Sequence, residues 1–132
     1  MTGSEHPNAL IAKRAWRAVS EADVDTLRKL WTDDIVWHVT TRNPWCGDHV
    51  GQDAVLDYLA NLGDSGDAYD STLDDVLASD ERALLVCGVS AARKGHSVES
   101  RYVILARFEG EQIAEVWTMP LEPEVLAAYW AD

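Results

Sequence analysis

The chain has 132 residues, a length typical of one domain, and 47% of them are hydrophobic, which is enough for a core. Its net charge of −12 disfavours binding to nucleic acid or to anionic lipid. No apolar stretch approaches the length of a membrane span, and the polar start lacks the apolar core of a signal peptide. We therefore expect a single cytoplasmic domain over residues 1–132, with no membrane partner.

Periodic apolar residues predict three helices in the first half of the chain. Asn8 is expected to cap the first helix, and Asp23 the second, because both side chains accept hydrogen bonds from helix N–H groups. The second helix is expected to turn Val24 and Trp31 inward. The third is predicted over residues 52–62.

Other segments show the two-residue alternation of apolar and polar residues that is typical of strands. A short strand is predicted at 35–40, before a loop at 42–51. Four long strands are predicted at 69–78, 83–93, 97–108 and 112–119, and a terminal helix at 123–130. The apolar run 83–89 indicates a strand covered on both faces. The order indicates an α+β fold, with three helices on a curved, mostly antiparallel sheet.

Four short motifs carry a resemblance to a known superfamily. They are Ala-Asp-Val-Asp at 22–25, Trp-Thr-Asp-Asp-Ile-Val-Trp-His at 31–38, Gly-Asp-His-Val-Gly at 47–51 and Gly-Glu-Gln-Ile-Ala-Glu-Val-Trp at 110–117. Their order and spacing resemble the SnoaL-like polyketide cyclases and ketosteroid isomerases of the nuclear-transport-factor-two-like superfamily. This resemblance implies a cone-shaped α+β barrel that encloses a pocket for a small hydrophobic molecule. The fold hosts many activities, so it does not name one.

His38 is the leading candidate for a catalytic residue. The resemblance to ketosteroid isomerases places it where those enzymes have their general-base carboxylate, and a histidine titrates near neutral pH. If His38 points into the cone, strand alternation turns Val36 inward as well. Two interpretations stay open: His38 moves a proton, or it only shapes the pocket.

Other groups of the relatives are missing. Ala15 and Ile104 stand where ketosteroid isomerases have the two donors of their oxyanion hole, and Val116 and Thr118 stand where many cyclases carry an acid/base pair. Tyr102 is left as a candidate to hold a substrate oxygen beside His38.

The remaining candidate residues are expected to contact the ligand without taking part in a reaction. Alternation predicts that the inner face of the sheet contributes Ser100, Tyr102, Ile104, Val116 and Thr118, while Glu115 and Trp117 point outward. Trp16, Trp45 and Tyr58 are expected to line the pocket, with Arg42 and His49 at its mouth.

Two functions remain open at this point. The first is a cofactor-independent isomerase, cyclase or dehydratase acting on a small hydrophobic molecule. The second is a binding or assembly module without catalysis, which the missing acid/base pair favours. Neither a metal nor a cofactor is expected, since Cys46 and Cys87 form no CxxC pair and no His, Asp or Glu spacing indicates ligands. Val103 and Leu105 among charged residues predict a homodimer through the convex face of the sheet.

Overall fold

The computed structural model describes residues 5–131, which form four helices and one six-stranded sheet. In chain order the elements are α1 (Pro7–Ser20), α2 (Val24–Leu30), β1 (Trp31–Val39), β2 (Gly47–Val50), α3 (Gln52–Gly63), β3 (Ala68–Ala78), β4 (Arg82–Arg93), β5 (His96–Glu109), β6 (Gln112–Pro120) and α4 (Pro123–Trp130). The predicted α+β class and the order of the main elements are confirmed. The segment 47–50, expected in a loop, forms an edge strand.

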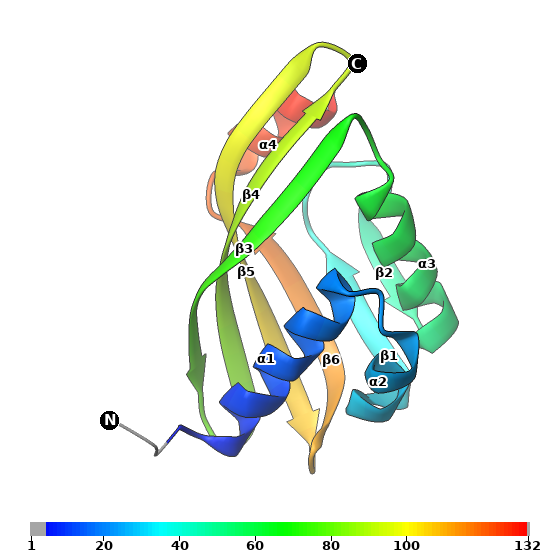
Figure 1. Ribbon diagram of the computed structural model, residues 1–132, viewed down its shortest axis with the longest axis vertical. Helices are drawn as coiled ribbons and strands as arrows, with labels where there is room; N and C mark the ends of the chain where they lie inside the picture. Colours follow the sequence, from blue (N-terminus) through cyan, green and yellow to red (C-terminus); the bar gives the residue numbers. More distant parts are fainter. Residues whose placement is uncertain (1–4, 132) are drawn as a thin grey trace.

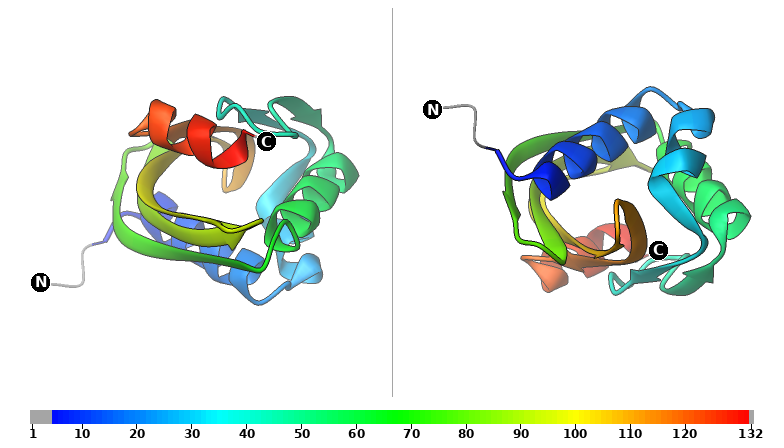
Figure 2. Two further views of the ribbon diagram at one scale, coloured as in Figure 1. Left: turned by 90° about the horizontal axis from the view of Figure 1, so that it is seen from above. Right: turned by 90° about the horizontal axis from the view of Figure 1, so that it is seen from below.

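The sheet is strongly curved and wraps around the centre of the molecule. Its strand order is β2-β1-β6-β5-β4-β3, with β1 parallel to β6 and the other neighbours antiparallel. Helices α1 and α3 lie against the concave side, and α4 lies across the other end of the long strands (Figure 1). A view along the long axis shows the sheet and helices arranged as a ring (Figure 2).

The first two helices begin at different kinds of cap. The prediction that Asn8 caps α1 is wrong, because the ring of His6 accepts the hydrogen bond from the Asn8 N–H at 3.0 Å. The buried Asn8 amide instead donates to the carbonyl oxygens of Ser79 and Asp80, which ties α1 to the turn between β3 and β4. Asp23 caps α2 as predicted, through the Thr26 N–H.

Two residues assigned to the inner face of the second helix behave differently. Val24 is 40% exposed in the first turn of α2, so its predicted inward position is wrong. Trp31 is buried, but it begins β1 instead of ending α2, since the chain there pairs with Ile113 of β6.

The register of β1 reverses the predicted faces of this strand. An irregularity between Trp31 and Val36 interrupts the pairing with β6. Beyond it, Ile35, Trp37 and Val39 are buried, whereas Val36 and His38 lie on the outer face. Burying the ring of Trp37 removes more apolar surface from water than burying an imidazole would. The prediction that Val36 and His38 face the cone is therefore wrong.

The apolar strand β4 is covered on one face only. Ala83, Leu85 and Cys87 are buried toward the helices. Leu84 and Val86 on the other face are half-buried, so within a single chain the predicted cover is complete on one face only. The outer face of the long strands thus presents apolar side chains to the surroundings of a single chain.

Candidate functional site

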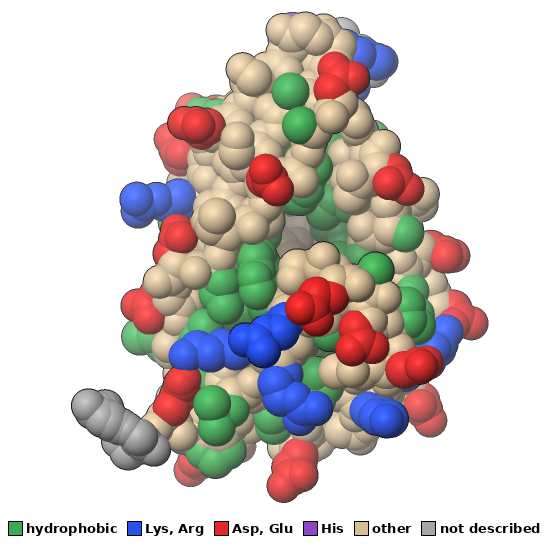
Figure 3. Space-filling model, in the orientation of Figure 1, with side chains coloured by type: hydrophobic (Ala, Val, Ile, Leu, Met, Phe, Trp, Pro, Cys, Tyr) green, Lys and Arg blue, Asp and Glu red, His purple; other side chains and the backbone are tan. Residues whose placement is uncertain are grey.

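A cavity of about 380 Å³ lies between the concave face of the sheet and the helices. Figure 3 shows a hollow with hydrophobic side chains in its walls, between β3 and α3 and above the C-terminal end of α1. The walls come from α1, α3, α4 and every strand except β2. Aromatic and aliphatic side chains form most of the lining, among them Trp16, Trp31, Trp37, Tyr58, Leu59, Tyr69, Leu85, Tyr102, Ile104, Val116 and Trp130. Such walls suit an apolar ligand.

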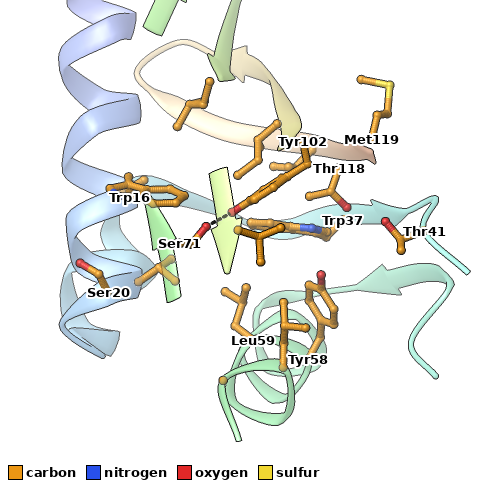
Figure 4. Close-up of a pocket in the computed structure, with 18 of the residues that line it drawn as sticks. Trp16, Ser20, Trp37, Thr41, Tyr58, Leu59, Ser71, Tyr102, Thr118 and Met119 are labelled. Atoms are coloured by element: carbon orange, nitrogen blue, oxygen red, sulfur yellow. Dashed lines mark hydrogen bonds between the residues drawn. The ribbon is translucent and has the colours of Figure 1, made fainter. Parts of the chain in front are cut away.

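Tyr102 and Ser71 form a polar pair within this apolar lining. Their oxygens lie 2.5 Å apart, and the Ser71 hydroxyl donates to the Gly88 carbonyl oxygen at 2.9 Å. Because Ser71 has one proton and it goes to Gly88, Tyr102 must be the donor in the pair. Figure 4 shows the two side chains meeting from β5 and β3. The Tyr102 proton is therefore already engaged within the protein.

The phenols of the cavity are neutral at physiological pH. Burial raises the pKa of Tyr58 and of Tyr102 above the usual range, and it raises the pKa of Tyr69 to about 12. A neutral phenol can donate or accept a hydrogen bond but is not a base. Asp70 is the one charged side chain among the described lining residues, and it is exposed on β3.

Trp37, in the wall of the cavity, has a buried indole N–H without a partner among the described residues. The side chain is 7% exposed, and its Nε1 is buried with no hydrogen-bond partner among the described residues. Its ring packs edge-on against Trp31, with centroids 6.3 Å apart, and is tilted against Tyr58 at 6.1 Å. These contacts fix the direction of the N–H.

His38 lies outside the cavity, in a charged cluster on the outer face of the sheet. Its Nδ1 is 2.6 Å from a carboxylate oxygen of Asp48, and its Nε2 is 2.6 Å from one of Glu115. Glu115 also accepts from the Arg107 guanidinium at 3.1 Å, and the His38 ring stacks on Trp117. Two ionised carboxylates can only accept, so both ring nitrogens must carry protons and His38 is an imidazolium.

The pKa values in this cluster agree with that geometry. Partial burial lowers the pKa of His38, but the hydrogen bonds and charges of Glu115 and Asp48 outweigh it, and the pKa is raised above its ordinary value. The hydrogen bond from His38 and that from Arg107 lower the pKa of Glu115 against its desolvation. This arrangement holds the proton of His38 in place, away from the cavity.

Trp45, predicted to line the pocket, and His49, predicted at its mouth, pack against Tyr58 beside the cavity. Trp45 contacts Tyr58 and Trp130 edge-on, and the His49 ring stacks on Tyr58 with centroids 4.8 Å apart. The His49 Nε2 is 2.8 Å from the Trp45 carbonyl oxygen, so it donates there. Arg42 is exposed in the same loop. None of Trp45, His49 and Arg42 lies among the described lining residues, whereas the neighbouring Thr41 and Asn43 do.

The structure thus brings half of the predicted residues together. The ones that line the cavity are Trp16, Tyr58, Tyr102, Ile104, Val116 and Thr118. Ser100 is buried but donates to Glu122 at 2.8 Å, beside α4. The prediction missed Trp37 and Ser71. The alternation of Ile35, Trp37 and Val39 was a signal for the first, and the second depends on a contact between distant strands.

The described residues provide neither a metal-binding cluster nor a membrane-spanning helix. No group of three or more His, Cys, Asp or Glu side chains among residues 5–131 is arranged to hold a metal ion. Within the same residues, no helix is long and apolar enough to cross a membrane.

Comparisons with known proteins show which family the chain belongs to. The model of the SnoaL-like domain matches residues 12–116. The uncharacterized protein Rv0034 of Mycobacterium tuberculosis is 27% identical over 126 residues, which cover 92% of this chain and 94% of that protein.

Solved structures share the fold. Bal32a, from a soil-derived mobile gene cassette, superposes with a TM-score of 0.87 at 23% identity over 95% of this chain and 97% of its own. An NTF2-like protein of Burkholderia xenovorans gives 0.83 at 19% identity, over 98% and 100%. At these identities the two structures show a common fold and no common activity. The family match over most of the chain goes further: this protein belongs to the SnoaL-like domain family.

Proposed function

We propose that the protein binds a small, uncharged, mainly apolar molecule in its central cavity and does not act as an acid–base catalyst through His38. The observation that carries this proposal is the chemistry of the lining. Its walls are aromatic and aliphatic, and its phenols are neutral. An anionic ligand would lose its hydration there without gaining a partner of opposite charge, and the one charged lining residue, Asp70, is exposed on β3.

The position of His38 argues against an isomerase or cyclase mechanism that uses this residue. A general base has to reach the proton it removes, directly or through one water. Both nitrogens of His38 are bonded to carboxylates on the outer face of the sheet, whereas the cavity lies behind the inner face. Proton transfer by His38 to a molecule in the cavity would require the strand to turn over.

The size of the cavity sets the expected affinity. A ligand that buries about 250 Å² of apolar surface gains about 6 kcal/mol before the cost of immobilising it. The gain alone corresponds to a Kd of about 40 μM, and the cost of immobilising the ligand weakens binding toward the millimolar range.

A substitution that fills the cavity tests the proposal. Ala15 lines the cavity from α1, and Ala15→Phe places a ring in the space of the ligand. We expect fluorescence titration with the uncharged dye N-phenylnaphthylamine to show saturable binding to the wild-type protein and at least ten-fold weaker binding to this variant. Leu10→Phe is the matched control, because Leu10 lies on the same helix and is 51% exposed. Equal binding by Ala15→Phe and the wild type would contradict the proposal.

We also propose that two chains pair through the outer face of β4, β5 and β6. Val103, Leu105 and Trp117 are half-buried on this face of a single chain, with Arg101 and Arg107 beside them. Apolar side chains within a charged rim support an interface of this kind.

Light scattering after size exclusion checks the pairing. We expect a dimer for the wild type and a monomer for Val103→Glu, since a carboxylate would be buried without a partner. Leu10→Glu is the control, because Leu10 is 51% exposed and belongs to α1, which lies on the concave side of the sheet. A wild-type protein that stays monomeric at micromolar concentration would contradict the pairing.

A further inference from the structure

The strongest unused feature of the cavity is the indole N–H of Trp37. It is a buried donor with no partner among the described residues, on a ring held between Trp31 and Tyr58. Buried N–H groups in proteins are nearly always bonded, since leaving one unbonded loses its hydration without return. An indole can only donate, so its partner must be an acceptor.

The surroundings of the indole nitrogen indicate where that acceptor would lie. In Figure 4 the nitrogen is on the side of the ring toward Thr118 and Thr41, above the hydroxyl of Tyr58. Thr118 already directs its hydroxyl to the His38 carbonyl oxygen at 3.4 Å. The hydroxyls of Thr118, Thr41 and Tyr58 thus lie on the nitrogen side of Trp37, whereas the Tyr102–Ser71 pair is drawn at the other end of its ring.

Tyr102 differs from Trp37 in this respect. Its proton is bonded to Ser71, which in turn donates to Gly88, so this pair is satisfied within the protein. The Tyr102 hydroxyl would have to give up that bond to donate to a ligand. The Trp37 N–H would break no existing hydrogen bond when it donates to a ligand oxygen.

The acceptor is also restricted by charge. No Lys, Arg or His is among the described residues that line the cavity, and the chain carries a net charge of −12. A carboxylate or phosphate would be buried without a counter-charge. A neutral oxygen with an exposed lone pair, such as that of a ketone, meets both conditions.

We propose that Trp37 recognises a carbonyl oxygen, so that the ligand class is uncharged, mainly apolar ketones. This inference rests on the proposed binding function and adds one specific contact to it. The indole N–H selects among apolar molecules of the same shape, preferring one that carries an oxygen at this point over one that does not. Loss of a paired oxygen leaves the buried donor unbonded again, which is the basis of such selection.

A pair of probes of equal shape tests this selection. Acetylnaphthalene is a ketone, and isopropenylnaphthalene has a CH₂ group in place of the oxygen. We expect both to bind the wild-type protein. In NMR titrations of isotope-labelled protein, the Trp37 indole N–H signal should move downfield with the ketone and not with the alkene.

Binding affinities of two variants test the energetic contribution of the Trp37 N–H. Trp37→Phe keeps an aromatic ring and removes the donor, so we expect the ratio of ketone to alkene affinity to fall about ten-fold. Trp16→Phe is the matched control, because Trp16 lines the same cavity from α1, and its ratio should stay that of the wild type. If Trp37→Phe does not fold, the wild-type indole signal, assigned through its contact with Tyr58, decides the question.

The outcomes separate the two proposals. An unchanged ratio in Trp37→Phe, or an indole signal that moves equally with both probes, would overturn the role of Trp37 while leaving the binding function standing. Failure of both probes to bind the wild-type protein would overturn the binding function together with it.

Discussion

His38 resembles a catalytic residue in the sequence, but in the structure it links strands on the outer face of the sheet. It lies between β2 and β6, and its two ring nitrogens bond Asp48 on one strand and Glu115 on the other. The imidazolium thus links the edge strand β2 to a strand that is not its neighbour in the sheet. Its stacking on Trp117 adds a contact on the same face.

This linkage should make stability depend on pH. The pKa of His38 is raised in the folded chain, so its contribution is complete below the ordinary value of 6.5 and is lost as pH rises through the folded pKa. The pKa of Glu115 is lowered from 4.5, so its contribution is present above that value and is lost as pH falls through the folded pKa. The cluster therefore stabilises the fold most between these two ordinary values.

His38→Phe tests the linkage. It keeps an aromatic ring against Trp117 and removes both hydrogen bonds, and we expect the free energy of unfolding at pH 6 to fall by about 1–2 kcal/mol. The difference from wild type should shrink as pH rises toward 9, as measured by urea denaturation at each pH. A difference that stays constant over that range would show that the proton on His38 does not matter. Binding of N-phenylnaphthylamine should be unchanged, because His38 does not line the cavity.

Residue positions could be predicted on some strands and not on others. On β5 and β6 the inward set of Tyr102, Ile104, Val116 and Thr118 was predicted correctly, because simple alternation holds along those stretches. On β1 the irregularity after Trp31 and the preference for burying large rings reversed the faces. A resemblance to enzymes with a carboxylate near this point favoured the wrong register. The apolar residues at 35, 37 and 39 carried the better signal.

At the scale of elements, the terminal helix α4 closes one end of the cavity and depends on one buried arginine. The Arg93 guanidinium donates to the Tyr129 carbonyl oxygen at 2.8 Å and lies 5.2 Å from the ring centre of Trp130. Trp130 in turn lines the cavity and meets Trp45 edge-on. The contacts of a side chain on β4 therefore position a wall of the ligand site.

Arg93→Met should loosen this helix. The change removes a charged donor from a buried carbonyl and the cation over two rings, so we expect a loss of about 2 kcal/mol in the free energy of unfolding. Hydrogen exchange should speed up in residues 123–130 more than in the strands. Arg14→Met, an exposed position on α1, is the control and should change neither quantity. Unchanged exchange in α4 would contradict this role of Arg93.

The existence and order of the elements could be predicted because they depend on local periodicity and turn residues. Their ends could not be predicted in the same way. Asn8 is a cap candidate by residue type, yet its amide donates to a turn 71 residues away, and His6 caps the helix instead. Trp45 and His49 were expected to line the pocket or its mouth, but they pack behind Tyr58. Each of these outcomes depends on long-range contacts that no local pattern records.

For the whole molecule, the curved sheet and the helices enclose a cavity of about 380 Å³ whose lining is apolar, aromatic and electrically neutral apart from the exposed Asp70. The charged side chains that resemble catalytic groups lie on the outside, in the cluster around His38. The sequence predicted the cone and an aromatic pocket through its resemblance to relatives. It did not predict that the pocket has an unpaired indole donor, because that depends on which neighbours fail to reach Trp37.

A crystal structure of the protein grown with acetylnaphthalene tests the central claim most directly, since it shows where an uncharged apolar molecule binds. We predict electron density for the ring system inside the cavity, between Trp16, Tyr58 and Ile104, with His38 still bonded to its two carboxylates. A cavity that stays without density at saturating ligand, or a ligand bound at His38 on the outer face, would contradict the account.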